Sequence, residues 1–331
     1  MKKIFIILLI IMIIPIRVNA INLGKSAILM EEDTKRVLVS KNINKKMLIA
    51  STTKIMTAIL AVESEKMNKM VTVTDKVLES YGSNIYLKPG EKMKLRDMVY
   101  GLMMQSGNDA ALMISEYLGG EEKFVQKMNN KAKEIGMINT IFNNPHGLDE
   151  KNENISTAYD MALLMGYANS YEEFKKITSC TKHTVTTNDK TYVWKNKNKL
   201  LYTYKYTTGG KTGFTKKARR TLVTSASKNN MNLIAVTLND NNDFKNHKQL
   251  YEYGFNNYSM EKVLDKNKVH FKNKKMYILD DFYYPITTKE KKLITISYKI
   301  NRKKANNYEK IGTLIVKLSG NIIHEEPIYI K

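Results

Sequence analysis

The chain has 331 residues, a formal net charge of +22 and a composition that is 43% hydrophobic. This length and apolar content allow one large or two ordinary globular domains with real cores. The single cysteine, Cys180, excludes an intramolecular disulfide, so burial of apolar side chains has to stabilise the fold.

The first twenty residues have the pattern of a secretory signal peptide. Lys2 and Lys3 give a positive start, residues 4–16 are apolar, and residues 18–20 end in the small alanine of a cleavage site. The apolar run is shorter than the roughly 20 residues that a membrane-spanning helix needs. We interpret residues 1–20 as a signal peptide and the mature protein as exported to the extracellular, cell-wall face of the membrane. An uncleaved N-terminal anchor is the alternative.

The excess of lysine is spread through the chain among asparagines. Because the protein is expected to be exported, an anionic cell envelope is a more natural partner for this charge than nucleic acid. Lysine that merely keeps the surface soluble is the alternative explanation for part of it.

The mature chain opens with a hairpin pattern, two apolar strands over 26–30 and 36–40 joined by polar residues. A helix with Ser51 in its first turn follows, and its predicted apolar face carries Ile55, Met56, Ile59 and Leu60. A second strong helical pattern covers 95–103. The segment "QSGND" interrupts it before a third helix, which carries Ala111, Ile114 and Leu118.

Helices and loops are predicted up to about residue 175, after which strand patterns return. They lie near 181–193 and in "GGKTGFT", "TLVTSAS" and "NLIAVTL", before a helical pattern over 244–256. From about residue 262 the pattern becomes short strands, "KVHF", "MYILD", "LITISYKI" and "TLIVKL", separated by polar turns. We therefore predict a main domain over 21–260 and a small all-β domain over 261–331.

Three short motifs carry candidate chemistry, and their context separates them from chance matches. S-x-x-K occurs four times and S-G-N twice, whereas K-T-G occurs once. Of the S-x-x-K matches, only Ser51/Lys54 opens a clean helical pattern. Ser106–Asn108 lies at the break between two helices, while Ser319–Asn321 lies between two strands, where glycine and asparagine simply make a turn.

Ser51 and Lys54 have the spacing of a nucleophile and its base. Residues three apart share a helix face, so the Lys54 amine can reach the Ser51 hydroxyl. A lysine at its usual pKa near 10.4 is protonated, so Lys54 serves as a base only if burial or a neighbouring cation lowers its pKa. Lys211 is the candidate neighbour.

The other motif residues have chemistry that suits a peptide substrate. Lys211 would attract an anionic substrate, and Thr212 would donate a hydrogen bond to its carboxylate. Gly213 would let the strand backbone approach the substrate closely. Ser106 would relay a proton, and Asn108 would hold the peptide amide.

With these motifs in place, the sequence resembles the penicillin-binding proteins and serine β-lactamases, which share S-x-x-K, S-x-N and K-T-G. The segments "ASTTKIMTA", "LKPGEKMKLRDMVYGLMMQSGNDAA", "NNPHGLDE", "STAYDMA" and "GGKTGFTKKA" resemble the low-molecular-mass D-alanyl-D-alanine carboxypeptidases in particular. The likeness covers about 22–256. It implies an α/β fold, a transpeptidase-like antiparallel sheet flanked by helices, followed by the small β domain.

The resemblance also implies a reaction. Ser51 would attack the penultimate D-alanine of a peptidoglycan stem pentapeptide ending in D-Ala-D-Ala and expel the terminal D-alanine. Lys54 would be the base, and the backbone N–H groups of Ser51 and Phe214 would form the oxyanion hole. Penicillins and other β-lactams would acylate Ser51. No cofactor and no metal are implied, and the five histidines lack the close paired spacing of a zinc site.

The sequence departs from the family pattern in three places. A basic run over 216–220 follows the K-T-G-F-T segment where small or acidic residues are usual. Some members hold the substrate carboxylate with an arginine beyond the next strands; here His247 stands near that place, so the carboxylate-binding residue is left open. Membrane-bound members end in an amphipathic helix, and none is visible after "EEPIYIK", which puts attachment through the C-terminus in doubt.

Three other functions compete with the carboxypeptidase. A class A-like β-lactamase is disfavoured because Gly107 stands where those enzymes carry aspartate, and no Glu-x-x-x-Asn segment follows. A catalytically idle peptidoglycan-binding or penicillin-sensing protein is disfavoured by the intact motif residues. A polycationic wall-binding protein without chemistry rests only on the charge, which is non-specific.

Overall fold

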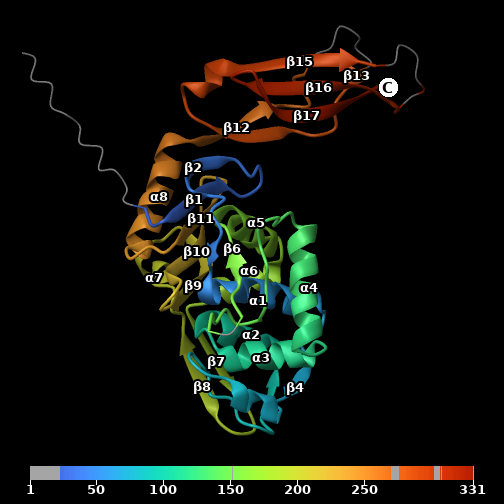
Figure 1. Ribbon diagram of the computed structural model, residues 1–331. Helices are drawn as coiled ribbons and strands as arrows, with labels where there is room; N and C mark the ends of the chain where they lie inside the picture. The colour runs from blue at the N-terminus through green and yellow to red at the C-terminus, as the bar shows by residue number, and fades with distance from the viewer. Residues whose placement is uncertain (1–22, 151, 270–275, 302–305, 307, 331) are drawn as a thin grey trace, which may run out of the picture.

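The computed structural model describes residues 23–150, 152–269, 276–301, 306 and 308–330. The expected signal peptide, residues 1–20, lies outside this part, as does half of the strand expected over 268–271. Within the described residues, no helix combines the length and apolar character needed to cross a bilayer. The chain forms a large mixed domain and a smaller β domain that stands beyond the end of helix α8 (Figure 1).

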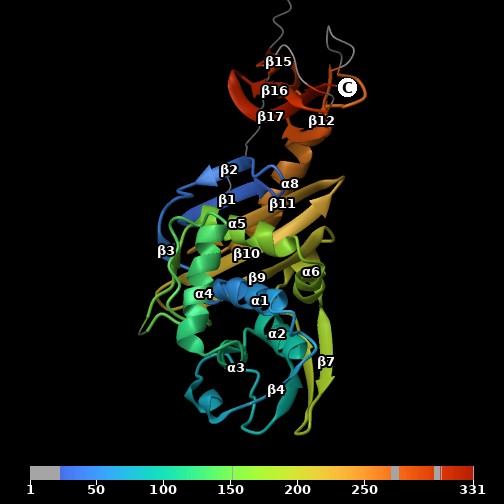
Figure 2. The ribbon, with the colours of Figure 1, turned by 90° about the vertical axis from the view of Figure 1, so that its right-hand side faces the viewer.

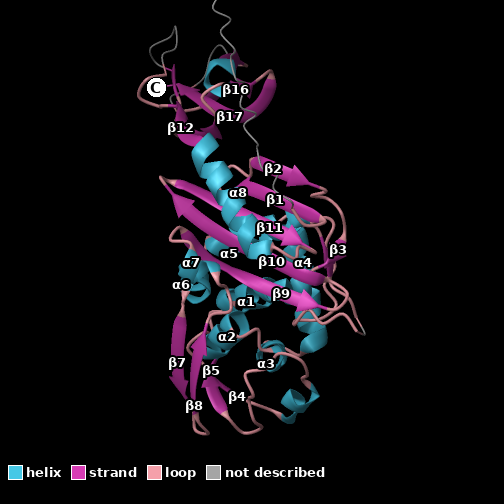
Figure 3. Cartoon of the chain, turned by 90° about the vertical axis from the view of Figure 1, so that its left-hand side faces the viewer, coloured by secondary structure: helices cyan, strands magenta, loops and turns pink. Residues whose placement is uncertain are grey.

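A five-stranded antiparallel sheet organises the large domain. Its strands, in spatial order, are β2 (Val37–Lys41), β1 (Ser26–Glu31), β11 (Met231–Leu238), β10 (Arg219–Lys228) and β9 (Thr207–Thr215). Helix α8 (Asp243–Asn257) covers one face (Figure 3), and most of the other helices lie on the opposite face (Figure 2). Because both faces are covered, β11 is almost continuously apolar and lacks an exposed polar side. Strand β9 lies at the edge.

Seven helices and two 3₁₀ turns complete the described part of this domain. Turn η1 (Ala50–Thr53) leads directly into α1 (Lys54–Glu63), and η2 (Asp75–Glu79) precedes α2. The remaining helices are α2 (Leu95–Met104), α3 (Asn108–Tyr117), α4 (Glu121–Glu134), α5 (Ala158–Asn169), α6 (Glu172–Ser179) and α7 (Leu200–Thr203).

The prediction of an amphipathic α1 is wrong in one respect. The helix is buried on nearly all sides, because other helices surround it within the large core. Its polar residues are satisfied internally: Thr57 Oγ1 donates to the carbonyl of Pro145 at 2.6 Å, for example. Ser51 lies in the preceding 3₁₀ turn, at the end of this central helix that reaches the surface.

Three two-stranded ribbons support the helical side. They pair β3 (Met47–Leu48) with β6 (Ile155–Ser156), β4 (Met70–Thr72) with β5 (Lys92–Lys94), and β7 (Lys182–Thr186) with β8 (Thr191–Lys195). The last ribbon corresponds to the strand text near 181–193. The β4–β5 ribbon was not anticipated, because its strands are only three residues long and too short to show a period.

The small domain contains a β12 (Ser259–Leu264)–β14 (Phe282–Ile286) ribbon and a four-stranded sheet. The sheet order is β13 (Met276–Tyr277), β17 (Asn321–Ile330), β16 (Lys310–Leu318) and β15 (Ile294–Ile300), and turn η3 (Glu290–Leu293) precedes β15. Ser319 and Gly320 form the β16–β17 turn, as predicted for the second S-G-N. The division at residue 260 remains a prediction, since β12 runs across it.

One arginine connects the two domains. The Arg36 guanidinium lies over the rings of Tyr258 and Tyr284, at 5.3 and 5.0 Å from their centroids. It also donates to the carbonyl of Pro285 and pairs with the Glu290 carboxylate. These contacts join the β1–β2 turn to the β12–β14 ribbon.

Candidate active site

Turn η1 presents Ser51 to a cleft, and a neighbouring loop shapes the turn. Ala50 has a positive φ of 47°, an uncommon conformation for a residue with a side chain. Gly147 packs against it so closely that a Cβ there would lie 2.0 Å from the Ala50 carbonyl oxygen. Glycine is therefore required at 147 for the loop to contact the turn that carries Ser51.

Lys54 is fully buried and lies within hydrogen-bond distance of Ser51. Its Nζ is 3.1 Å from Ser51 Oγ, 2.7 Å from Asn108 Oδ1 and 2.5 Å from the carbonyl oxygen of His146. A neutral amine has two N–H groups and one lone pair. The two carbonyl oxygens can accept the N–H groups, which leaves the lone pair directed at the Ser51 hydroxyl.

The surroundings of Lys54 favour this neutral form. Burial lowers the pKa of Lys54 well below its usual value, and the positive charge of Lys211 lowers it further, against an opposing effect of Asp109. His146 has no charge to add, since burial and the nearby Lys54 lower its pKa to about 3. His146 thus supports the loop and supplies a backbone acceptor.

The break between α2 and α3 places Ser106 and Asn108 beside Lys54. Ser106 has a positive φ of 66° and lines the cleft. Asn108 is held at several points: its Nδ2 donates to the Tyr81 carbonyl at 2.6 Å, and its backbone N–H donates to the Ser83 carbonyl at 2.7 Å. Its Oδ1 is thereby aimed at Lys54.

The loop that carries Tyr81 and Ser83 is itself held by buried carboxylates. Asp109 accepts hydrogen bonds from the backbone N–H groups of Ile85 and Leu87, at 3.0 and 3.1 Å. Further along the loop, Glu91 is 2% exposed.

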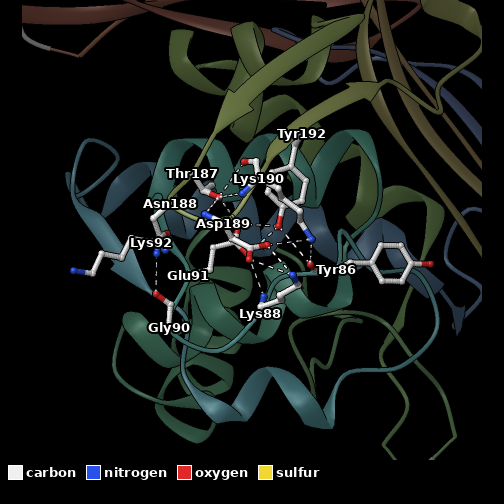
Figure 4. Close-up of polar contacts among 10 residues, drawn as sticks. All are labelled: Tyr86, Lys88, Gly90, Glu91, Lys92, Thr187, Asn188, Asp189, Lys190 and Tyr192. Atoms are coloured by element: carbon white, nitrogen blue, oxygen red, sulfur yellow. Dashed lines mark hydrogen bonds and ion pairs between the residues drawn. The ribbon is translucent and has the colours of Figure 1, made fainter.

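A polar network joins Glu91 to the β7–β8 ribbon (Figure 4). Glu91 accepts from the hydroxyls of Tyr192 and Thr187, both at 2.8 Å, and from the Lys88 backbone N–H at 3.1 Å. Lys190 Nζ adds a bond to the Tyr86 carbonyl at 2.7 Å. The sequence did not reveal this support, because its two halves lie about a hundred residues apart.

Strand β9 brings K-T-G to the other side of Ser51. Lys211 is buried, its Nζ donates to the Thr212 carbonyl at 2.7 Å, and burial together with the charge of Lys197 lowers its pKa to about 7. At Gly213 a Cβ would lie 2.3 Å from Thr221 Oγ1 and 3.0 Å from the Ser51 nitrogen. Only glycine lets this edge strand approach the turn that carries Ser51 so closely.

Five of the predicted site residues, Ser51, Ser106, Thr212, Gly213 and Phe214, line one cleft with a volume of about 520 Å³. It is lined by Ser51, Ser83, Ser106, Asn196, Lys197, Lys199, Thr212, Gly213, Phe214, Arg220, Asp243 and Phe244. A larger cavity of about 730 Å³ lies between the two domains, near Tyr283 and His324. We take the smaller cleft as the candidate site, because Ser51 lines it together with Thr212 and Gly213 of K-T-G.

His247 is not part of this cleft, so the suggestion that it contacts the substrate is wrong. It is fully buried between α8 and the sheet, where its ring nitrogens lie 2.7 Å from Thr224 Oγ1 and 3.1 Å from Thr237 Oγ1. Burial lowers its pKa to about 3, which suits a neutral core histidine. The helical spacing of Asn246, His247, Leu250 and Tyr251, all buried, could have indicated this inward orientation.

Comparison with known proteins identifies the class. Residues 18–242 match the family model described as D-alanyl-D-alanine carboxypeptidase, and residues 255–331 match the one described as penicillin-binding protein 5, C-terminal domain. The chain belongs to the D-alanyl-D-alanine carboxypeptidase family. The recognised resemblance and the fold class, an antiparallel sheet flanked by helices followed by a β domain, are confirmed.

Individual relatives extend the likeness over most of the chain. The D-alanyl-D-alanine carboxypeptidase DacF of Bacillus subtilis (strain 168) is 34% identical over 93% of this chain and 85% of its own length. DacC of Escherichia coli (strain K12) is 35% identical over 70% of this chain and 61% of its own length. The crystal structure of penicillin-binding protein 5 from Haemophilus influenzae superposes with a TM-score of 0.80, at 26% identity, over 93% of this chain and 96% of that one.

Proposed function

We propose that the protein is a serine D-alanyl-D-alanine carboxypeptidase that removes the terminal D-alanine from peptidoglycan stem pentapeptides. Family membership supports the reaction. The observation that carries the assignment to this site is the buried Lys54 amine, 3.1 Å from Ser51 Oγ and depressed in pKa by its surroundings. That geometry suits a nucleophile and a general base.

In acylation, Ser51 Oγ attacks the carbonyl carbon of the penultimate D-alanine while Lys54 takes the hydroxyl proton. The oxyanion forms between the backbone N–H groups of Ser51 and Phe214, donors that typically contribute about 10²–10³ each in rate. As the C–N bond breaks, Ser106 relays a proton to the leaving D-alanine nitrogen. In deacylation Lys54 activates a water molecule, which attacks the ester and restores Ser51.

The edge position of β9 explains how an extended peptide can be held. A peptide aligned along this strand can add its backbone hydrogen bonds to the sheet edge. Asn108 is 2% exposed and already bonded to Lys54 and Tyr81, so its contact with the peptide amide stays a prediction. Lys211 and Thr212 attract the carboxylate end. β-Lactams carry an acyl group and a carboxylate in a comparable arrangement, so we expect them to acylate Ser51.

The place of action follows from features outside the catalytic cleft. The N-terminal pattern favours export to the cell-wall face of the membrane, where peptidoglycan lies. With a carboxypeptidase activity there, we propose a role in cell-wall synthesis and cell shape. The charge of +22 suits an anionic envelope better than nucleic acid. We further propose the organisation 1–20 signal peptide, 21–260 catalytic domain and 261–331 β domain.

The test is D-alanine release from a pentapeptide ending in D-Ala-D-Ala. The parent should release D-alanine and Ser51→Ala should release none. Ser179→Ala is the matched control, because Ser179 begins another S-x-x-K match but is exposed and bonds to the carbonyl of Lys175. Release by Ser51→Ala at the parent rate would refute the nucleophile. No release by the parent would favour an idle binding or sensing protein, and rapid penicillin turnover instead would favour a β-lactamase.

A further inference from the structure

The cleft contains an ion pair that the reaction chemistry does not use. Arg220, from β10, pairs with Asp243, the first residue of α8, and both residues line the cleft together with Thr212. We infer that Arg220, held in place by Asp243, binds the free C-terminal carboxylate of the substrate and thereby selects for it. This inference rests on the proposed carboxypeptidase function and names the residue that sets its specificity.

The sheet register puts Arg220 on the correct side of the K-T-G strand. Arg220 lies directly opposite Phe214 in the β9–β10 ladder, and Leu222 lies opposite Thr212. Side chains of paired residues, and of residues two apart, share a sheet face. Arg220 and Thr212 are therefore diagonal neighbours on the α8 face, so a carboxylate bound by the Thr212 hydroxyl lies within reach of a long arginine.

The guanidinium is held rigidly but only on one side. Its Nη2 lies 2.7 Å from Asp243 Oδ1 and its Nε lies 3.1 Å from Asp243 Oδ2, a two-point contact. Phe244 contributes twice: its ring lies 5.5 Å from the guanidinium carbon, and its backbone N–H donates to Asp243 Oδ1 at 2.7 Å. These bonds leave Nη1 and the second Nη2 hydrogen for another acceptor.

The two side chains of the pair differ in exposure. The Asp243 side chain is 4% exposed, whereas that of Arg220 is 41% exposed. The acid thus lies beneath the cation, and the cation faces the cleft. Asp243 is the sole acidic residue among the described cleft-lining residues, against the cations of Lys197, Lys199 and Arg220. This charge distribution favours an anion.

The other candidates fit the role less well. His247 is buried behind the sheet, as described above. Lys197 is occupied by the Gln105 carbonyl, to which its Nζ donates at 2.7 Å, and burial lowers its pKa. Arginine also suits a carboxylate better than lysine, because its planar fork offers two parallel N–H groups.

The experiment compares two substrates that differ only in the carboxylate. The thioester N-benzoyl-D-alanyl-thioglycolate has a free carboxylate, and its methyl ester has none; both are cleaved at the same acyl bond. Arg220→Gln should lower kcat/KM for the acid by about 10–100-fold, the effect of one hydrogen-bonded charge pair, and leave the methyl ester unchanged. The ratio of kcat/KM for the acid to that for the methyl ester, which is high in the parent, should therefore be lost in Arg220→Gln.

Three further variants separate recognition from folding. Arg219→Gln removes the same charge from the neighbouring exposed residue and should change neither rate. Arg220→Lys keeps the charge but loses the two-point contact. It should therefore show an intermediate loss of kcat/KM, and only for the substrate with the free carboxylate. Asp243→Asn should likewise lower kcat/KM only for the substrate with the free carboxylate, because Arg220 loses the partner that holds it in place.

If Arg220→Gln lowered kcat/KM equally for both substrates, or for neither, the inference would be overturned. Arg220 would then be a structural residue. Failure of the proposed function looks different, since the parent itself would then cleave neither thioester, and the inference would fall with it.

Discussion

The two domains of this protein have interiors of different kinds. The large domain buries Lys54, Lys211, Glu91 and Asp109 within or beside its core. In the described part of the small domain, the core consists of aliphatic side chains, and Glu326, bonded to His324 at 3.0 Å, is the one buried charged residue.

The buried charges of the large domain suit chemistry better than stability. A buried cation loses its hydration, and its burial is unfavourable unless partners compensate. Burial accordingly lowers the pKa values of Lys54 and Lys211. A lowered pKa favours a neutral amine beside Ser51, whereas the described part of the β domain buries no lysine.

Of the changes that test this contrast, replacing the buried Lys54 should have the largest effect, a slower acylation of Ser51. Lys54→Met should lower the rate of Ser51 acylation by about 10²–10⁴-fold, the usual contribution of a general base. Stopped-flow acylation by a fluorescent penicillin measures it. Lys182→Met is the control, since Lys182 belongs to another S-x-x-K match and is exposed. A Lys54→Met protein that acylates at the parent rate would show that a different group takes the proton.

Lys211 should shape the pH dependence. Only neutral Lys54 accepts a proton, so kcat/KM should rise with pH through the depressed pKa of Lys54. It should fall again above about 7 as Lys211 loses the charge that attracts the carboxylate. In Lys211→Met the fall should vanish, and the rise should move to higher pH because a cation no longer disfavours protonation of Lys54.

The size of the Lys211 effect should be smaller than that of Lys54. The loss of one charge-assisted contact predicts about a 10–100-fold lower kcat/KM at pH 6 for a carboxylate-bearing peptide. A pH–rate profile from 5 to 10 for both proteins measures both effects. An unchanged profile in Lys211→Met would show that the two lysines are not coupled.

In the β domain, a change in the core should alter stability and leave the chemistry intact. Leu314→Ala, at a residue that is 1% exposed, should destabilise that domain by about 2–5 kcal/mol. Ile322→Ala, on the same sheet but exposed, should change stability by about 0.5 kcal/mol or less. Thermal unfolding measures both. A loss of Ser51 acylation in folded Leu314→Ala protein would contradict this prediction and show that the core of the β domain supports the cleft.

Much of the fold could be predicted because local patterns carried it. The β1–β2 hairpin, α2, α3, α8 and the strands around K-T-G follow hydrophobic periods that a single segment displays. The single K-T-G and the helix break at Ser106–Asn108 likewise indicated the cleft. The structure brings these residues together with Ser51 and Lys54, and their catalytic roles remain predictions.

The remaining features depend on contacts between distant segments. The Glu91–Tyr192 bond joins residues 101 positions apart, and no local pattern indicates it. The position of α1 at the centre of the core depends on how the other helices surround it. No local pattern in the basic run over 216–220 separates Arg219 from Arg220, but the ladder turns Arg220 toward Asp243 and leaves Arg219 exposed.

The central claim is that Ser51 is the acylated nucleophile. Its most direct test is the intact mass of the parent and of Ser51→Ala after brief exposure to benzylpenicillin, followed by peptide mapping. The account predicts one penicilloyl group on the parent, on the peptide that contains Ser51, and none on the variant. A variant that gains the same group as the parent would contradict it.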